Sequence, residues 1–137
     1  MSKERYLTKP QQYALVYRKG RSSATDLLVM RFLSNGLALS RCGFSVSKRL
    51  GNAVIRNRVK RRLREIWRVI PLKPGWDIVF IARPAAASAG FDTLKGAIEG
   101  LLSRAGLLET GRADFLAGYK TVNDGGDIAG SRGIVWQ

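Results

Sequence analysis

The sequence contains no histidine and a single cysteine, Cys42, among its 137 residues. A chain without histidine cannot build a histidine-ligated metal site or use an imidazole as acid or base, and one cysteine cannot form an internal disulfide. Long apolar runs are also missing, and the N-terminal segment MSKERYLTKPQQ has no hydrophobic stretch typical of a signal peptide. We therefore expect no membrane span and no secretion, and we favour a reducing, cytoplasmic setting.

Acidic residues are scarce in the first half of the chain. Residues 1–68 hold 17 of the 24 lysines and arginines but only three of the ten acidic residues, whereas residues 69–137 hold seven of each. The whole formal net charge of +14 therefore lies in the first half. Because so much like charge repels itself in a compact domain, a polyanionic partner is expected. Nucleic acid is favoured over an acidic membrane surface or a purely solubilising role.

The carboxylates that exist do not suggest catalysis by the protein itself. Five of them lie scattered along the chain with no pair at a helical spacing that would share a site, namely Glu4, Asp26, Glu65, Asp77 and Asp92. Two-metal nucleases need several converging acids. Ser45 and Ser47 have no histidine to activate them, and activation of a serine by Lys48 is less favoured than a chance juxtaposition of these residues. We predict no catalytic residue and no metal ligand in this chain.

The length and the 45% hydrophobic content indicate one domain with a single modest core. Thr8 and Gln11 predict a capping box that opens a helix ending at Gly20. On this helix Tyr13 and Tyr17 lie four residues apart and share a face, which could pack into the core or offer stacking platforms to unpaired bases.

Three further patterns complete the predicted fold. The apolar run 26–33, the Asn35-Gly36 pair and the alternating segment 37–47 predict two strands joined in a hairpin. The segment WDIVFIA at 76–82 predicts an interior strand. Residues from Asp92 or Thr93 to Gly106 predict a capped amphipathic helix. With the basic helix described next, this order predicts an α+β domain with three helices and about four strands.

The segment 48–70 predicts the most unusual element, a helix capped by Asn52. Apolar residues at helical spacing form one buried stripe, namely Ile55, Val59, Leu63, Ile66, Trp67 and Ile70. Nine basic residues surround the stripe against the single acid Glu65: Lys48, Arg49, Arg56, Arg58, Lys60, Arg61, Arg62, Arg64 and Arg68. Most of these basic residues are arginines, whose planar guanidinium group can donate two hydrogen bonds to phosphate oxygens. Phosphate binding is therefore favoured over a merely solvated helix face. Asn52, Arg56 and Asn57 lie where the helix N-terminus would add to this attraction.

These residues resemble the protein subunit of bacterial ribonuclease P. The resemblance is carried by GFSVSKRLGNAVIRNRVKRRLREIWR at 43–68, and supported by TKPQQYALVYRKGR, GWDIVFIARP and LKGAIEGLLSRAGL in the family's order. It covers roughly residues 7–108. We accordingly predict a domain over 1–108 and a flexible C-terminal tail over 109–137.

The resemblance implies a fold similar to the second domain of ribosomal protein S5, with a left-handed crossover that contains the basic helix. It implies that an RNA subunit, using Mg²⁺, removes the 5′ leader of precursor tRNA. The protein then acts as a cofactor of that RNA, with the catalytic RNA and precursor tRNA as partners, and with neither a membrane nor a small-molecule substrate.

Site residues follow from the resemblance position by position. Arg56, Asn57 and Arg58 match an Arg-Asn-Arg element that lies against the catalytic RNA, and the other basic residues of 48–68 together with Asn52 join this RNA-binding set. Tyr13, Tyr17, Ser45 and Ser47 match positions beside the single-stranded leader, in a cleft between the first helix and the sheet. Arg31 is assigned to the same cleft, although the family often places an aromatic residue there.

Two other readings share the charge pattern. A binding module associated with the ribosome would have the same basic surface, and it would co-purify with ribosomal particles. A metal-dependent nuclease acting alone would stay active in preparations free of RNA. Both are less favoured than the ribonucleoprotein subunit.

Overall fold

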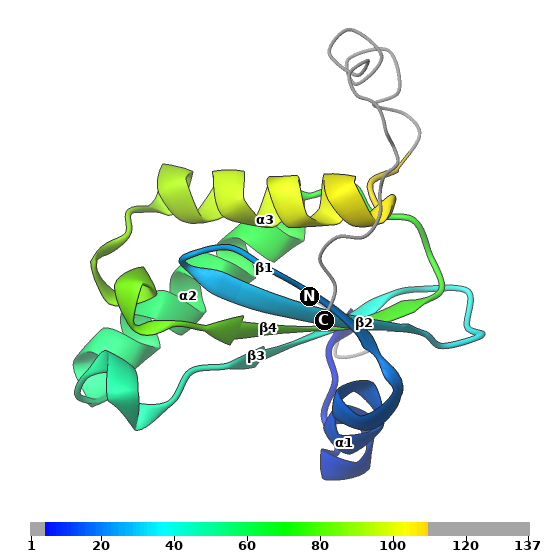
Figure 1. Cartoon of the computed structure of the whole chain (residues 1–137), viewed down its shortest axis with the longest axis horizontal. Helices are drawn as coiled ribbons and strands as arrows, with labels where there is room; N and C mark the ends of the chain where they lie inside the picture. Colours follow the sequence, from blue (N-terminus) through cyan, green and yellow to red (C-terminus); the bar gives the residue numbers. More distant parts are fainter. Residues whose placement is uncertain (1–4, 110–137) are drawn as a thin grey trace, which may run out of the picture.

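The computed structural model describes residues 5–109, which form three α-helices around one sheet (Figure 1). The helices are α1 (Pro10–Lys19), α2 (Ala53–Val69) and α3 (Phe91–Ala105). The strands are β1 (Arg21–Ala24), β2 (Leu28–Ser34), β3 (Arg41–Ser45) and β4 (Trp76–Ala82). Two short 3-10 helices, η2 (Lys48–Leu50) and η3 (Pro84–Ser88), follow β3 and β4. The predicted α+β class with three helices and about four strands is confirmed.

The strands form one mixed sheet in the order β1-β2-β4-β3. β2 pairs antiparallel with β1 and with β4, while β3 pairs parallel with β4. The interior position predicted for WDIVFIA is therefore confirmed. β1 was not predicted, because its sequence RSSA buries only Ser23 and shows no alternation of apolar residues.

The hairpin predicted at Asn35-Gly36 is wrong. β4 lies between β2 and β3, so the strands on either side of the turn do not pair. Asn35 instead donates its side-chain amide to the carbonyl of Leu39 at 3.2 Å and to Asp77 Oδ1 at 2.8 Å. Gly36 takes a left-handed φ of 72°, which glycine allows without strain. The pair thus shapes a loop that binds β4, and the next strand begins only at Arg41.

The parallel strands β3 and β4 are neighbours joined through α2, so they form the crossover unit that the sequence suggested. Residues 5–7 extend the sheet beyond β3. Tyr6 makes a parallel bridge with Cys42, and the Leu7 N–H donates to the Cys42 carbonyl at 2.9 Å. The left hand of the crossover stays a prediction from the resemblance.

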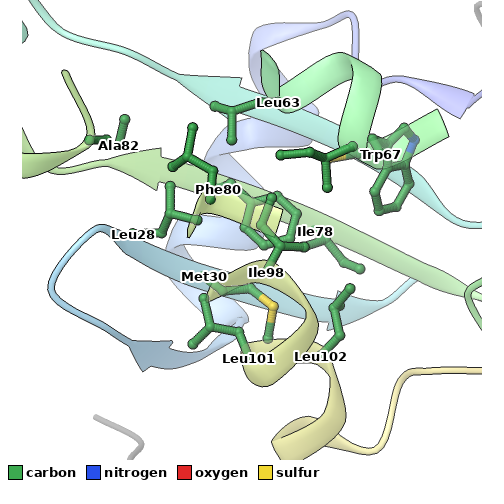
Figure 2. Packing of buried hydrophobic residues seen from close by; sticks show 14 of the residues in the cluster. Leu28, Met30, Leu63, Trp67, Ile78, Phe80, Ala82, Ile98, Leu101 and Leu102 are labelled. Atoms are coloured by element: carbon green, nitrogen blue, oxygen red, sulfur yellow. The ribbon is translucent and has the colours of Figure 1, made fainter. Parts of the chain in front are cut away.

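The larger hydrophobic cluster lies on the face of the sheet covered by α2 and α3 (Figures 1 and 2). Alternate residues of β2 and β4 point into it because side chains on a strand alternate between faces. Figure 2 shows side chains from both helices meeting those of the sheet, among them Leu28, Met30, Leu63, Trp67, Ile78, Phe80, Ile98, Leu101 and Leu102. This face holds most of the buried apolar surface.

A smaller hydrophobic cluster lies on the opposite face, between the sheet and α1. Leu7, Val16 and Val79 are buried there, with Tyr13 and Ile81 packed against them. Figure 1 shows α1 below the sheet, on the side away from α3.

The N-termini of α2 and α1 show which of the predicted capping residues are used. Asn52 caps α2 as expected, since its Oδ1 accepts the Ile55 N–H at 3.0 Å. For α1 the predicted box of Thr8 and Gln11 is wrong, because Gln12 Oε1 accepts the backbone N–H groups of Thr8 and Lys9. A helix begun one residue later puts Gln12 at its third position.

The start predicted for the last helix is also wrong. α3 begins at Phe91 behind Gly90, with no side-chain cap, while its predicted end at Gly106 is confirmed by a left-handed φ of 76°. Beyond α3, Leu108 bridges Leu72, and the Glu109 N–H donates to the Pro71 carbonyl at 3.0 Å. The rest of the predicted tail lies outside the described residues.

Candidate nucleic-acid interface

The cationic surface is built on α2 by the burial of its apolar stripe. Val59, Leu63, Ile66 and Trp67 are buried against the sheet and α3, while Ile55 is half-buried. Successive residues of a helix are 100° apart, so burial of the apolar stripe directs the intervening arginines and lysines outward. Among them Arg61, Arg64 and Arg68 are exposed and Lys60 is half-buried.

No acidic side chain pairs with these cations in the part of the chain that the structure describes. The one ion pair within residues 5–109 joins Arg41 to Asp77, neither of which belongs to α2. Surface helices ordinarily mix charges and gain from pairs four residues apart. A surface of unpaired guanidinium groups is instead suited to the regularly spaced phosphates of a nucleic acid.

The segment before α2 adds charge at the N-terminus of the helix. Ser47 Oγ accepts the Arg49 N–H at 3.3 Å and so opens η2, which is anchored by the buried Leu50. Lys48 and Arg49 are exposed on η2, next to the exposed Asn52 and Asn57 of the capped end. A phosphate there would meet both the side-chain charges and the positive end of the helix dipole.

Three of the predicted RNA-binding arginines also donate to the chain's own carbonyls. Arg56 Nε donates to the Gly51 carbonyl at 3.3 Å. Arg58 donates to Ala87 at 3.3 Å, and Arg62 donates to Ala89 at 2.7 Å, so both hold the segment around η3 against α2. These side chains are half-buried. α2 therefore has one flank tied to η3 and a remaining surface whose guanidinium groups face solvent.

The two tyrosines of the predicted leader set occupy different environments on α1. Tyr13 packs against the smaller cluster and over β3, whereas Tyr17 is 40% exposed. Burial raises the pKa of the Tyr13 hydroxyl, with smaller contributions from Cys42 and Tyr17, against a hydrogen bond from the Phe44 backbone N–H that lowers it. Tyr13 is therefore packed against the sheet but only half-buried, whereas Tyr17 offers an open ring.

Arg31 lies on the same face as the tyrosines, in the middle of β2. Its guanidinium donates to the carbonyl of Tyr17 and, at 3.1 Å, to the carbonyl of Gly20. These carbonyls belong to the end of α1, where a positive charge is favourable. Arg31 thus fixes α1 to the sheet beside Tyr17.

The two serines of the predicted leader set are separated by the end of β3. Ser45 is the last residue of the strand, on the side of Gly43, and is half-buried. Ser47 lies beyond the strand and caps η2. β3 consequently links the two sets of site residues, because it passes under Tyr13 and then leads into η2 and α2.

A polar network that the sequence did not reveal lies on this face. Asp77 is 4% exposed and accepts from Arg41 Nε at 2.9 Å and Arg41 Nη2 at 2.7 Å, and from Asn35. The hydrogen bond to Asp77 raises the pKa of Arg41. These residues are far apart in sequence, and only the register that sets Arg41 opposite Asp77 brings them together.

Residues 5–109 hold neither a cluster of metal ligands nor a membrane-spanning helix. Residues 5–109 contain no group of three or more cysteine or acidic side chains placed to hold a metal ion. Cys42 is buried, and burial raises its pKa well above the ordinary value, opposed in part by the charge of Arg5. None of the helices over this range is long and apolar enough to cross a membrane.

Known sequences match most of the chain. The family profile described as Ribonuclease P matches residues 1–106. A ribonuclease P protein component from Roseiflexus castenholzii is 46% identical over 106 residues, which cover 75% of this chain and 87% of the relative. One from Dehalococcoides mccartyi is 43% identical over 121 residues, covering 88% of this chain and 99% of the relative.

Solved structures share the fold. The ribonuclease P protein of Staphylococcus aureus aligns with a TM-score of 0.69 and 33% identity, covering 77% of this chain and 98% of that one. The protein from Thermotoga maritima aligns with a TM-score of 0.65 and 34% identity, over 72% and 96%. At these identities the likeness extends beyond a shared fold.

Proposed function

The chain belongs to the ribonuclease P protein family, and on that premise we propose that it binds the catalytic RNA through α2 and the 5′ leader of precursor tRNA through the face of the sheet beside α1. Ribonuclease P is an endoribonuclease that processes the 5′ end of tRNA. As its protein component, this chain has the RNA subunit of the holoenzyme as its partner.

The observation that supports RNA binding best is the unpaired positive surface of η2 and α2. Lys48, Arg49, Arg61, Arg64 and Arg68 are all exposed. None of them is ion-paired within the described range. Binding through such a surface releases counterions, so the affinity for the RNA subunit should fall steeply with salt. A flat plot of log K against log salt concentration would contradict this role.

The functional experiment is cleavage of precursor tRNA by the RNA subunit at low magnesium, with and without this protein. We expect stimulation by the protein, because its cations offset the repulsion between two RNA molecules. The absence of stimulation would overturn the proposed function. Activity of the protein without the RNA subunit, surviving ribonuclease treatment, would favour a self-sufficient nuclease instead.

Leader binding is proposed from the geometry of α1 and the sheet. Tyr17 presents an open ring, Tyr13 lies beside it over β3, and Ser45 and Arg31 belong to the same face. Aromatic rings stack on bases of any sequence, which suits leaders that differ among tRNA precursors.

The test of leader binding is Tyr17→Ala in the reconstituted holoenzyme. We expect it to weaken binding of precursor tRNA by about 1–3 kcal/mol, because a stacked base is lost, and to leave mature tRNA binding unchanged. Leu15→Ala is a matched control, since Leu15 is also on α1 and is 39% exposed. Equal effects of both substitutions, or of Tyr17→Ala on both RNAs, would contradict leader stacking.

We further propose that Mg²⁺ serves the RNA-catalysed hydrolysis, where a divalent ion stabilises charge on the attacking and leaving oxygens. No group of three or more acidic or cysteine side chains gathers within residues 5–109, and we assign no residue of this chain to the ion. We place the protein in the cytoplasm with its RNA partners, and we retain 1–108 as the binding domain with 109–137 as a tail.

A further inference from the structure

Gly43 lies in β3 directly beneath the ring of Tyr13. A Cβ added to Gly43 would be 2.5 Å from the Tyr13 Oη and 2.6 Å from its Cε1 and Cζ. Real Cβ atoms do not approach other atoms this closely, so any side chain at position 43 must displace the ring.

Position 43 is glycine because the Tyr13 ring leaves no room for a side chain, and not because the backbone needs an unusual conformation there. Gly43 is not among the glycines of residues 5–109 with a left-handed φ, which are Gly36, Gly51, Gly75 and Gly106. It pairs regularly with Val79 of β4. Alanine would therefore fit the backbone of β3, and the clash would fall on the far end of a flexible side chain.

Several contacts hold the ring of Tyr13 in this position over Gly43. It packs with the cluster of Leu7, Val16 and Val79, and its hydroxyl meets the backbone N–H of Phe44. Because that cluster occupies the space between α1 and the sheet, we expect a displaced ring to move outward, toward solvent. Tyr17, one turn further along α1, is 40% exposed.

We propose that Gly43 is a positioning residue for substrate binding: the missing side chain seats Tyr13 against β3 and so fixes one aromatic platform in advance of the leader. The inference rests on the proposed leader binding. A side chain that is already ordered loses less conformational entropy when a base stacks on it. Gly43 would thus contribute to leader affinity without touching RNA through a side chain of its own.

The experiment is a double-mutant cycle in the reconstituted holoenzyme, with Gly43→Ala, Tyr13→Ala and the double variant. The measured quantity is the affinity for precursor tRNA relative to mature tRNA. We expect Gly43→Ala to lower this ratio about three- to tenfold, and to add nothing once Tyr13 is alanine. Gly96→Ala is the control, because a Cβ there meets nothing within 4 Å.

A measurement on the free protein tests whether Gly43 lets the Tyr13 ring lie against β3. In the free protein, Gly43→Ala should lower the pKa of Tyr13 toward the ordinary tyrosine value, as followed by NMR titration of the ring, because the ring leaves its buried position. An unchanged Tyr13 pKa would overturn the inference. So would a Gly43→Ala effect that persists in the Tyr13→Ala background, or an equal loss of affinity for both RNAs. Normal leader discrimination in both Tyr13→Ala and Tyr17→Ala would instead overturn the proposed leader site, and this inference with it.

Discussion

The two faces of the sheet are made from alternate residues of the same strands, yet they are built differently. On the face under α2 and α3, β2 and β4 present Met30, Phe32, Ile78 and Phe80, all buried. On the face under α1 the same strands present residues such as Arg31 and Asp77, and β3 adds Gly43. One face is a continuous apolar core, and the other combines a small apolar cluster with polar groups and a glycine.

This difference separates the face that contributes most to stability from the face proposed to bind the leader. Burial of apolar surface is the dominant favourable term in folding, and most of it lies on the face covered by two helices. The face under α1 has only a helix of 10 residues to cover it, so groups such as Tyr17 stay exposed. If the leader binds as proposed, the face under α1 can be used for binding because the opposite face carries most of the folding energy.

The difference between the two faces of the sheet is tested most strongly by substituting neighbouring residues of β4 that point to opposite faces. Phe80 is 0% exposed and stacks on Phe44 with ring centroids 6.3 Å apart, whereas Ile81 is half-buried under α1. Phe80→Ala should lower the free energy of unfolding by about 3–5 kcal/mol, since it leaves a large cavity. Ile81→Ala should cost about 1–2 kcal/mol, because part of its side chain is already in water.

Urea unfolding of both variants measures these losses, and binding to precursor and mature tRNA measures recognition. Under conditions where each variant is folded, Ile81→Ala should reduce the preference for precursor, because α1 rests on this residue. Phe80→Ala should not change it. A larger stability loss for Ile81→Ala than for Phe80→Ala would contradict the assignment of most folding energy to the face under α2 and α3.

The second prediction concerns the polar network on the α1 face. Asp77→Asn removes the charge that pairs with Arg41 and should cost about 1–2 kcal/mol of unfolding free energy. The cost is smaller than for a fully buried pair because the Arg41 side chain is 21% exposed and can reach water. Asp26→Asn, at an exposed site, is the control and should be within about 0.5 kcal/mol of the parent. A cost equal to that of the control would show that the network does not hold β3 to β4.

Local patterns predicted the elements of the fold. The bounds of α2 follow from the Asn52 cap and an apolar stripe over several turns, and β4 follows from a largely apolar run. Both signals arise within one segment, so no knowledge of the rest of the chain was needed. The same holds for the cationic surface, because a helix with one buried seam must turn its remaining residues outward.

Contacts between distant segments were not predictable in this way. The Asn35-Gly36 pair is a good hairpin signal, but the placement of β4 between β2 and β3 depends on the packing of the whole sheet. The seat of Tyr13 on Gly43 and the pairing of Arg41 with Asp77 likewise arise only after the strands are in register. The alternating pattern around β3 predicted a strand, but it did not show that Tyr13 covers one of its faces.

The third and smallest prediction divides the surface of α2 itself, between the flank tied to η3 and the surface that faces solvent. Arg61 is exposed, whereas the neighbouring Arg62 donates to the Ala89 carbonyl at 2.7 Å. If the exposed guanidinium binds a phosphate of the RNA subunit, Arg61→Gln should reduce the slope of log K against log salt by about 0.7–0.9. Arg62→Gln should leave that slope unchanged and lower the unfolding free energy by about 1 kcal/mol, through the lost hydrogen bond. Filter binding to the RNA subunit at several salt concentrations, together with urea unfolding, measures both quantities. An equal fall in slope for the two variants would place Arg62 among the phosphate ligands, and the division of α2 into two surfaces would then be wrong.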